Sequence, residues 1–577
     1  MFNKYFQQEL ASLRELGAEF SRAHPALAPM LSGPAADPDV ERLLEGVAFL
    51  TGLLRQKLDD EFPEIVHDLM QVLLPHYLRP LPATTVIAFS PKPTLKQPMT
   101  VPAGIHVGSV PVEGTTCYFR TAYEVEVHPL VLLEASYTRP PGKAAVIRLL
   151  FELTGTKLSD WQPKGLRMFL AGDHSAAADL YLLLRRNLRR ILVTPVGKGA
   201  SAELPPDCLV PVGFGEKEGL IPYPSQSFPG YRVLQEYFVA PSKFLFLDIT
   251  GWDRWRERGD GTRFEVAFEL DETGIPPQKI KRENFALFAT PAVNVFPHDA
   301  DPISLDHRSA EYLVRPSGSN TAHYQVFSVD SVVGFVQGTA QERKYAPFEL
   351  FNPDHRTVPV YHTSRRPSVS GTGSDVYLSV AYPPEAGVPV AETLSLRLTC
   401  TNGTLPESLR QGDVSHATVS TPEYAEFRDI TPPTFSVPPP IGTNLMWRLI
   451  SHLSLNYLSL ARGENLRALL DLYLFPDSRD RVSLASNRKR VGGIEGVEAK
   501  PTDRLVDGLP MRGQEIGIRL RQDHFAGPGD LFLFGCVLDH FIGNYAAINT
   551  FTCLVVQETL KGDVYRWPVR IGNHPLL

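Results

Sequence analysis

The sequence predicts an α+β multidomain fold with an N-terminal helical segment, strand-rich central domains and an α+β C-terminal domain. Over roughly the first 78 residues, apolar side chains recur at spacings of three, four and seven, which is the pattern of one helix face. After the stretch PHYLRPLPAT the hydrophobic period changes to two, between turns rich in proline and glycine, as in half-buried strands. With 577 residues, the chain is long enough for about three or four domains.

The first two predicted helices are separated by the proline-rich stretch HPALAPMLSGPAADP. The apolar face of the first helix consists of Phe2, Tyr5, Phe6, Leu13, Leu16 and Phe20. We expect the second helix to have Asp37 as its N-cap and Pro38 at its first position, where the missing N–H costs nothing. A third apolar run, EIVHDLMQVLLPHYL, is expected to end at Pro75.

The second helix carries apolar residues on two sides and two internal glycines, Gly46 and Gly52. One face is formed by Val40, Leu43, Leu44, Val47, Leu50, Leu54 and Leu58. Phe49 and Leu53 lie roughly 140 to 180° away from the Val40/Leu44 side, with Gly46 near them. A helix that is apolar on both sides must be covered on both sides, and a glycine lets another backbone approach closely. We therefore expect the middle layer of a helix bundle, whose outer layer is either this chain or another one.

The central strands are predicted in the stretches TTVIAFSP, CYFRTAYEVEVHP and AAVIRLLFEL. One helix, from Asp173 to about Arg190, lies between the strand-like stretches GLRMFLAG and ILVTPV. Near the C-terminus, QEIGIRLRQ, DLFLFGCVLDHFIGNY and NTFTCLVVQE form a related strand, helix, strand unit. The turns AGDHSAAADLYLLL and AGPGDLFLFGCVL are alike, which suggests an internal duplication. The stretch MWRLISHLSLNYLSL returns to helical spacing.

These changes of pattern predict four domains. They are an N-terminal helical segment over 1–83, a strand-rich α+β domain over 84–289, a mainly β domain with a proline-rich exit over 290–440, and an α+β domain over 441–577.

Composition and charge argue against several classes of partner. The net charge of −7 and the sequence pI of about 6.2 give no electrostatic reason to expect nucleic acid or an anionic membrane. We expect no signal peptide in MFNKYFQQELASLREL and no membrane span, because no stretch approaches the ~20 apolar residues that a span needs. The scattered cysteines, without any CxxC pair, read as reduced and mostly buried thiols of a cytosolic protein. They are Cys117, Cys208, Cys400, Cys536 and Cys553.

The sequence contains none of the common catalytic or nucleotide-binding motifs, such as G-x-S-x-G, H-E-x-x-H or G-x-x-x-x-G-K-[ST]. The strongest metal candidate is the loop NVFPHDADPISLDHR. Its possible ligands are His298, Asp299, Asp301, Asp306 and His307. A metal-dependent hydrolase using residues 298–307 is the alternative function. The simpler interpretation is that these aspartates cap turns through their own backbone, so we expect no metal, cofactor or catalytic residue.

Three further polar features have a structural interpretation. The glycine cluster VGFGEKEG is read as a surface turn. The run Arg185, Arg186, Arg189 and Arg190 is read as a solvated helix face or a charged protein contact, and SNRKR as an exposed loop. His452 is read as a core histidine rather than a base.

Several stretches together resemble the TssF family, a baseplate subunit of the bacterial type VI secretion system. Near the N-terminus they are YFQQELASLRELGAEFSRAHPALAPML, DPDVERLLEGVAFLTGLL and SFPGYRVLQEYFVAPSKFLFLDITG. They continue with NVFPHDADPISLDHRSAEYLV, LSLRLTCTNGTLP, LMWRLISHLSLNYLSL and LFLFGCVLDHFIGNYAAINTFTCLVV. The resemblance runs from end to end in order, and its most specific parts are DPxVERLLEGxAFL, GYRxLxEYF and SHLSLNxLSL.

The resemblance implies a cytoplasmic structural protein without catalysis. Two copies are expected to join one TssG in a wedge that binds TssK and so leads to the inner-membrane complex. Contacts to TssE and to the spike hub are expected, and the contractile tail assembles on the ring of wedges. The expected partner interface contains Gly46, Phe49, Gly52, Leu53, Trp447 and Leu453. Leu43, Leu44, Val47 and Leu54 are instead expected to pack inside the chain's own helix bundle.

Overall fold

The computed structural model describes most of the chain in two compact units. The described residues are 2–23, 38–139, 144–224, 227–271, 279–318, 320–336, 338, 342–348, 358–368, 373–383, 391–441, 448, 463–506 and 508–572. The first unit comprises Met1–Leu73 and Ile441–Ile450, and the second comprises Leu74–Pro440 and Ser451–Leu577. Helices dominate the first unit and sheets the second, so the predicted α+β multidomain class is confirmed. The predicted boundaries after residues 83, 289 and 440 stay predictions.

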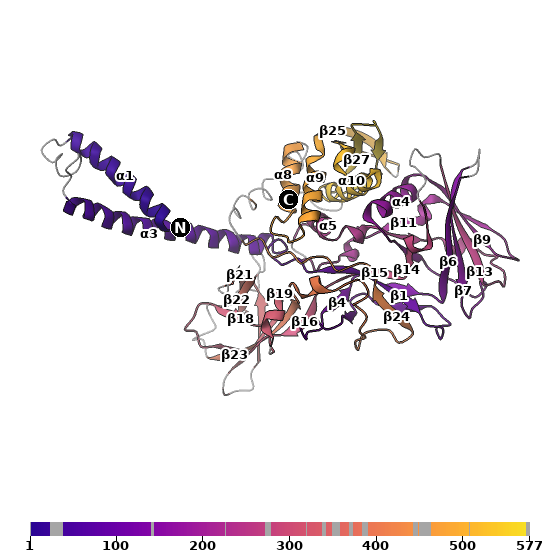
Figure 1. The fold of residues 1–577 in the computed structure, drawn as a ribbon, viewed down its shortest axis with the longest axis horizontal. Helices are drawn as coiled ribbons and strands as arrows, with labels where there is room; N and C mark the ends of the chain where they lie inside the picture. Colours follow the sequence, from indigo (N-terminus) through magenta and orange to yellow (C-terminus); the bar gives the residue numbers. More distant parts are fainter. Residues whose placement is uncertain are drawn as a thin grey trace. The chain divides into compact units, whose positions relative to one another are not determined.

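The first unit contains two long helices, α1 (Phe2–Ala23) and α3 (Pro38–Leu73), which lie side by side and run in opposite directions (Figure 1). The predicted start at Pro38 is confirmed, but the second and third predicted helices are one continuous helix that ends just before Pro75. Two ion pairs join α1 to α3: Arg55 Nη1 lies 2.6 Å from Glu9 Oε1, and Arg14 pairs with Glu41. The predicted helix over 446–460 lies outside the described residues, apart from residue 448.

The contact between α1 and α3 is made by small residues. Ala48 is fully buried, and a Cβ atom added to Gly52 would lie 3.2 Å from the backbone N of Phe6. Gly52 therefore permits the close approach of α1, and the other backbone expected at this glycine belongs to the same chain. Gly46 differs, because an added Cβ would meet nothing within 4 Å.

Replacing Gly52 with leucine is expected to loosen the helix pair. The larger side chain must push α1 away from α3, and such overpacking costs about 1–3 kcal/mol. Trypsin should then cleave after Arg14 and Arg22 faster than in the wild type. The matched control is Gly46→Leu, which enters open space and should leave the cleavage rate unchanged or lower, since leucine is the better helix former. Equal rates for the two variants would contradict this account of Gly52.

The central part of the second unit is built from three antiparallel sheets and a two-stranded pair. The first sheet has the order β24 (Ala425–Asp429), β1 (Thr84–Pro91), β15 (Ala289–Val293), β4 (Tyr118–Thr121) and β3 (His106–Gly108). The second has the order β10 (Ala202–Leu204), β9 (Leu188–Pro195), β13 (Arg263–Leu270), β7 (Ala145–Leu153) and β6 (Leu130–Thr138). The third has the order β11 (Leu209–Val212), β12 (Phe246–Ile249), β8 (Leu166–Leu170) and β14 (Phe285–Leu287). The pair is β2 (Met99–Val101) with β5 (Val125–Val127).

A larger sheet follows in the middle of the chain. Its order is β16 (Phe296–Asp299), β23 (Glu392–Thr401), β19 (Gln325–Val336), β20 (Glu342–Pro347), β21 (Val360–Pro367), β22 (Ser374–Ala381) and β18 (Tyr312–Val314), with β17 (Ile303–Leu305) also on β23. Alternate residues of β23 are buried and form its core, as the period of two predicts.

The C-terminal region combines helices with a mixed sheet. The sheet contains β25 (Ile494–Val506), β26 (Leu509–Leu520), β27 (Thr550–Glu558), β28 (Val564–Arg566) and β29 (Arg570–Ile571). Between β26 and β27 the chain forms α10 (Pro528–Gly543), and these two strands pair in parallel. The helices α8 (Gly463–Leu472) and α9 (Arg481–Gly492) precede the sheet.

Almost every residue of α10 is buried, because two helices and a strand pack against it. It packs against α4 (His174–Arg186), α5 (Pro229–Val239) and β27 (Figure 1). A helix that is apolar all round needs such a complete cover. The C-terminal strands therefore share their core with elements some 300 residues earlier in the chain.

The structure does not support the predicted internal duplication. The strands before and after α4, β8 and β9, belong to different sheets, whereas β26 and β27 are parallel neighbours. The predicted helix near Asp173 is confirmed, with Asp173 as its N-cap, but it ends at Arg186. Arg189 and Arg190 lie on β9, where Arg190 pairs with Glu203 and Glu269, so the four arginines do not share one helix face.

Candidate protein-interaction surface

The most exposed apolar surface in the first unit lies on α3. At about 100° per residue, seven positions of this helix fall within one sector of about 160° centred opposite Ala48. We call them the outer face of α3: Leu43, Gly46, Val47, Phe49, Leu50, Leu53 and Leu54. The exposed fractions of the six side chains are 68% for Leu43, 41% for Val47, 47% for Phe49, 62% for Leu50, 42% for Leu53 and 62% for Leu54.

The outer face corrects the predicted division of the helix into two apolar sides. Leu43, Val47 and Leu54 were expected inside the chain's own bundle, but they are exposed, and only Leu44 is half-buried. The reason is that α1 packs on Ala48 and Gly52, where small residues let two backbones come close. The large aliphatic side chains therefore point to the other side, together with Phe49 and Leu53.

The ends of the outer face are polar, which defines its size. Asp39 and Arg42 form an exposed ion pair at 3.5 Å before Leu43, and Gln56 and Lys57 follow Leu54 in the sequence. Leu43 and Leu54 are eleven positions apart, a length of ~16 Å along the helix. A contiguous apolar surface of this kind, bounded by polar residues, is typical of a protein interface.

The other predicted interface residues are Gly52, Trp447 and Leu453. Gly52 contacts α1 of the same chain and does not belong to the outer face. Trp447, Leu453 and the predicted core histidine His452 lie outside the described residues.

The predicted metal loop holds its polar groups in turn and strand contacts. His298 Nε2 donates to the Ser317 carbonyl oxygen at 2.9 Å, and its ring stacks on Tyr324. Asp306 Oδ1 accepts from the Arg308 N–H and from the Tyr312 hydroxyl, each at 3.1 Å. The turn-capping interpretation is thus confirmed for Asp306. The part of the chain that the structure describes contains no group of three or more His, Cys, Asp and Glu side chains placed to hold a metal ion.

Replacing both His298 and His307 with asparagine is expected to leave assembly and secretion near wild type. The change costs one hydrogen bond, about 1 kcal/mol. His307 has a left-handed backbone (φ 59°), which asparagine adopts readily. The check is a secretion assay beside a thermal melt of the purified variant. Loss of secretion with normal folding and normal partner binding would instead support the hydrolase.

The glycine cluster VGFGEKEG forms a turn whose residues 215–217 are exposed, as predicted, whereas the SNRKR stretch differs from its prediction. Glu218 Oε2 accepts from the Gly213 and Gly215 N–H groups at 2.7 and 2.8 Å, so this carboxylate occupies the anion-binding position of the turn. SNRKR lies on α9 rather than in an exposed loop, and Arg490 is almost completely buried.

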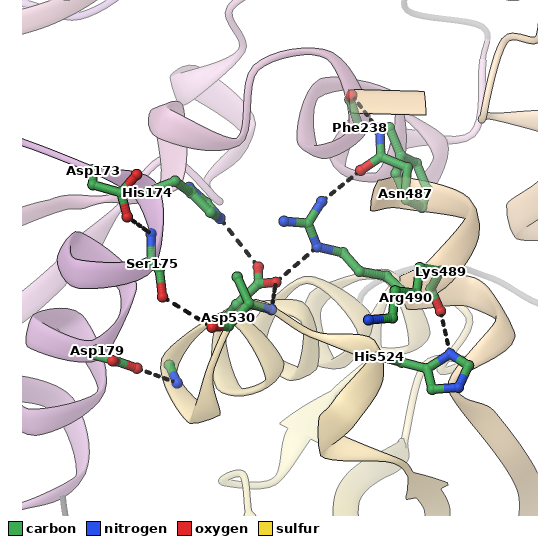
Figure 2. Close-up of polar contacts among 12 residues, drawn as sticks. Asp173, His174, Ser175, Asp179, Phe238, Asn487, Lys489, Arg490, His524 and Asp530 are labelled. Carbon is green, nitrogen blue, oxygen red and sulfur yellow. Dashed lines mark hydrogen bonds and ion pairs between the residues drawn. The ribbon is translucent and has the colours of Figure 1, made fainter. Parts of the chain in front are cut away.

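Arg490 belongs to a buried polar network around Asp530, which the sequence did not reveal (Figure 2). Asp530 is completely buried near the start of α10. Its Oδ2 accepts from Arg490 Nε at 2.9 Å and from the Ala526 N–H at 3.1 Å. Its Oδ1 lies 3.1 Å from His174 Nε2.

The same network joins the two similar turns at the starts of α4 and α10, AGDHSAAADLYLLL and AGPGDLFLFGCVL. Ser175 Oγ donates to the Ala526 carbonyl oxygen at 3.1 Å, and the Gly529 N–H donates to Asp179 Oδ1 at 2.8 Å (Figure 2). A Cβ atom on Gly529 would lie 2.3 Å from the backbone of Ala178, so α10 and α4 touch backbone to backbone. The two similar turns therefore contact each other. Because α10 and α4 pack so tightly there, the network holds these two helices together.

The acid dependence of stability is expected to reflect Asp530. Burial alone raises the pKa of a carboxyl group, but the hydrogen bond to His174 and the charge of Arg490 outweigh it and lower the pKa of Asp530 to about 2. A carboxyl group whose pKa is lowered in the folded state stabilises the fold at pH values above its ordinary pKa. This contribution is lost as the pH falls from about 4 to about 2. It amounts to about 2 kcal/mol. In urea unfolding at pH 3 and pH 6, Asp530→Asn should therefore lose less stability on acidification than the wild type; an equal loss in both proteins would contradict this assignment.

Two other predictions can be compared with the structure. All five cysteines are buried and unpaired, as expected. Within the described residues, none of the helices combines the length and the hydropathy needed to cross a bilayer.

Comparisons with known proteins identify the family. The chain matches the family described as type VI secretion system, TssF, over residues 1–574. It is 31% identical, over 628 aligned positions, to type VI secretion system component TssF1 of Pseudomonas aeruginosa, covering 100% of this chain and 99% of that protein. A cryo-electron microscopy structure of the type VI secretion system TssK-TssF-TssG baseplate subcomplex contains a similar chain, with a TM-score of 0.78, 31% identity, and coverage of 92% of this chain and 98% of that chain.

A chain of the baseplate complex from the type VI secretion system is also similar, with a TM-score of 0.61 and 27% identity over the whole length of both chains. Sequence and structure therefore agree over nearly the complete chain, and this protein belongs to the TssF family of the type VI secretion system.

Proposed function

We propose that this chain is a non-catalytic structural subunit of the type VI secretion baseplate that assembles with TssG and TssK. The observation that carries the proposal is the outer face of α3, which presents six large apolar side chains on one side of the α1–α3 helix pair. We infer the partners TssG and TssK from the similarity to a chain of the TssK-TssF-TssG subcomplex.

The physical argument starts from the exposed apolar side chains of α3. Each exposed large apolar side chain that becomes buried contributes about 1.5–3 kcal/mol. A helix pair with such a face is stable in water only at the cost of solvating it, so a further layer of helices from a partner is favoured. Gly46 lies in the middle of this face with open space beside it, which leaves room for a partner backbone.

The proposal includes the finer arrangement that the family resemblance implies. Two copies of the chain join one TssG in a wedge, the wedge contacts TssE and the spike hub, and the contractile tail assembles on the ring of wedges. The complex is cytoplasmic and docks to the inner-membrane complex. The residues proposed for the partner interface are Gly46, Phe49 and Leu53 on α3, and Trp447 and Leu453 in the predicted helix over 446–460. Leu43, Val47, Leu50 and Leu54 are added to them because they share the outer face of α3.

Co-expression with TssG and TssK tests the proposal. We expect a stable complex by size-exclusion chromatography with light scattering, and self-association of the chain when it is purified alone, because its apolar face is then uncovered. A monodisperse monomer that binds neither partner would refute the proposal and favour a third function, that of a carbohydrate- or protein-binding β-module that acts alone. A stoichiometric, tightly bound metal would favour the hydrolase.

A further inference from the structure

The outer surface of the C-terminal sheet contains a hollow at a missing side chain. Residues of β25, β26 and β27 form three rows of neighbours across the strands: Gly496–Arg519–Gln557, Glu498–Gly517–Val555 and Lys500–Glu515–Cys553. Because side chains alternate between the two faces of a strand, the members of these rows share one face. Gly517 stands at the centre of this grid, and its neighbours surround a groove of about 210 Å³.

Two glycines on neighbouring strands shape this groove. A Cβ atom added to Gly517 would have only the Glu498 carbonyl oxygen nearby, at 3.9 Å, so the space above Gly517 is open. A Cβ atom added to Gly496 would lie 2.6 Å from Arg519 Nη2. Gly496 therefore lets the Arg519 guanidinium lie across the neighbouring strand, at the edge of the hollow.

The charged side chains around the groove differ in whether they have a partner of opposite charge. Glu515 pairs with Arg504 at 2.7 Å and with Arg566 at 3.9 Å, and Glu498 pairs with Lys500 at 3.6 Å. Among the described residues, no carboxylate or carbonyl oxygen pairs with the exposed Arg519 side chain. The rim thus offers one planar cation without an acceptor, next to the apolar Val555 and to exposed glycine backbone.

We propose that this hollow is a docking site for one aromatic side chain of the TssG–TssK complex, an inference that rests on the proposed function. The groove is smaller than the ~300–1,000 Å³ of a typical ligand pocket, so it fits one side chain rather than a cofactor. An aromatic ring placed over Gly517 contacts the flat glycine backbone and Val555. Its face meets the Arg519 guanidinium, because a cation is attracted to the face of an aromatic ring.

The choice of a protein partner follows from the balance of charge and from the shape. The rim carries two acidic and two basic side chains, which does not select a phosphate or a nucleic acid. Aromatic side chains seated in small pockets are the residues that contribute most to protein interfaces. Acceptors beside the ring on the partner would complete the hydrogen bonding of Arg519 and Gln557.

The test fills the hollow without disturbing the fold. In Gly517→Leu the new side chain enters open space on a strand where glycine is unfavourable, so the Tm should be equal to or above that of the wild type. Binding of the full-length chain to purified TssG–TssK complex, measured by interferometry, should weaken about tenfold or more. Arg519→Ala should weaken it about fivefold by removing the cation. The control Thr502→Leu places the same side chain on the same face of β25 outside the groove and should bind like the wild type.

A competition experiment tests the aromatic character of the occupant. Millimolar N-acetyltryptophanamide should weaken TssG–TssK binding by the wild type but not by Gly517→Leu, whose hollow is filled. Wild-type affinity of both Gly517→Leu and Arg519→Ala, or no competition at all, would overturn the inference and leave the proposed function intact. Failure of the wild-type chain to bind TssG–TssK would overturn the proposed function as well.

Discussion

Replacing Asp530 with alanine is expected to destabilise the second unit by about 3–5 kcal/mol, because it leaves the charge of Arg490 buried without its partner. Arg490 and His174 approach Asp530 from α9 and α4, so the loss affects the joint between elements far apart in the sequence. The Tm of the purified chain should fall by several degrees. Proteolysis should detect opening around α10, which contributes to the core on nearly all its sides.

Two further variants test whether the loss of stability in Asp530→Ala comes from the buried charge. Asp530→Asn keeps an oxygen that accepts hydrogen bonds but removes the charge, so its Tm should lie between those of alanine and the wild type. Asp523 pairs with Arg521 on the exposed surface of the same region, and Asp523→Ala should melt like the wild type. If Asp530→Ala also melts like the wild type, the network does not stabilise the joint.

The sequence predicted best those features that depend on local pattern. The stretch TTVIAFSP became β1 over the same residues, because a short run rich in β-branched and aromatic residues favours a strand. The helix start at Pro38 and the N-cap at Asp173 were also correct, since caps depend on a few neighbouring residues. The end of α4 was missed because Leu188–Pro195 pairs as β9 between two other strands, a long-range contact that overrides helical spacing.

The network around Asp530 could not be found from such patterns. Arg490 and Asp530 are 40 positions apart, and His174 and Asp530 are 356 positions apart. An arginine in SNRKR and an aspartate in AGPGD look like ordinary surface residues until the fold brings them together. The similarity between the two turns was the one available signal, and the structure shows that it marks the place where they touch.

The outer face of α3 shows a different limit of sequence reasoning. Periodicity correctly indicated more apolar surface than one helix contact can bury. It did not indicate which side the chain itself covers, because large aliphatic residues were assumed to face inward. The small residues Ala48 and Gly52 determine the answer, since only they allow α1 to approach α3 so closely. Hence the large side chains of α3 stay exposed in the chain itself.

Introducing two charges on the outer face of α3 is expected to abolish assembly while keeping the fold. Leu50 and Leu54 are largely exposed, so Leu50→Glu with Leu54→Glu removes little buried surface from the chain itself, and the circular dichroism spectrum and the protease pattern should stay unchanged. In a complex these glutamates would be buried without partners at a cost of several kcal/mol. Binding to TssG should therefore weaken roughly a hundredfold or more.

Further variants of α1 and α3 test which residues belong to this proposed interface. Phe49→Glu with Leu53→Glu tests its edge and should also fold and fail to assemble. Leu44→Asp places a charge on the side facing α1, where the side chain is half-buried, and should instead loosen the hairpin. Gln8→Glu with Ser12→Glu adds the same charge at exposed polar positions of α1 and should bind TssG normally. If the Leu50/Leu54 variant unfolds, these residues belong to the chain's own core. If it folds and still binds TssG with wild-type affinity, the partner covers another surface, and the open space beside Gly46 has no role in assembly.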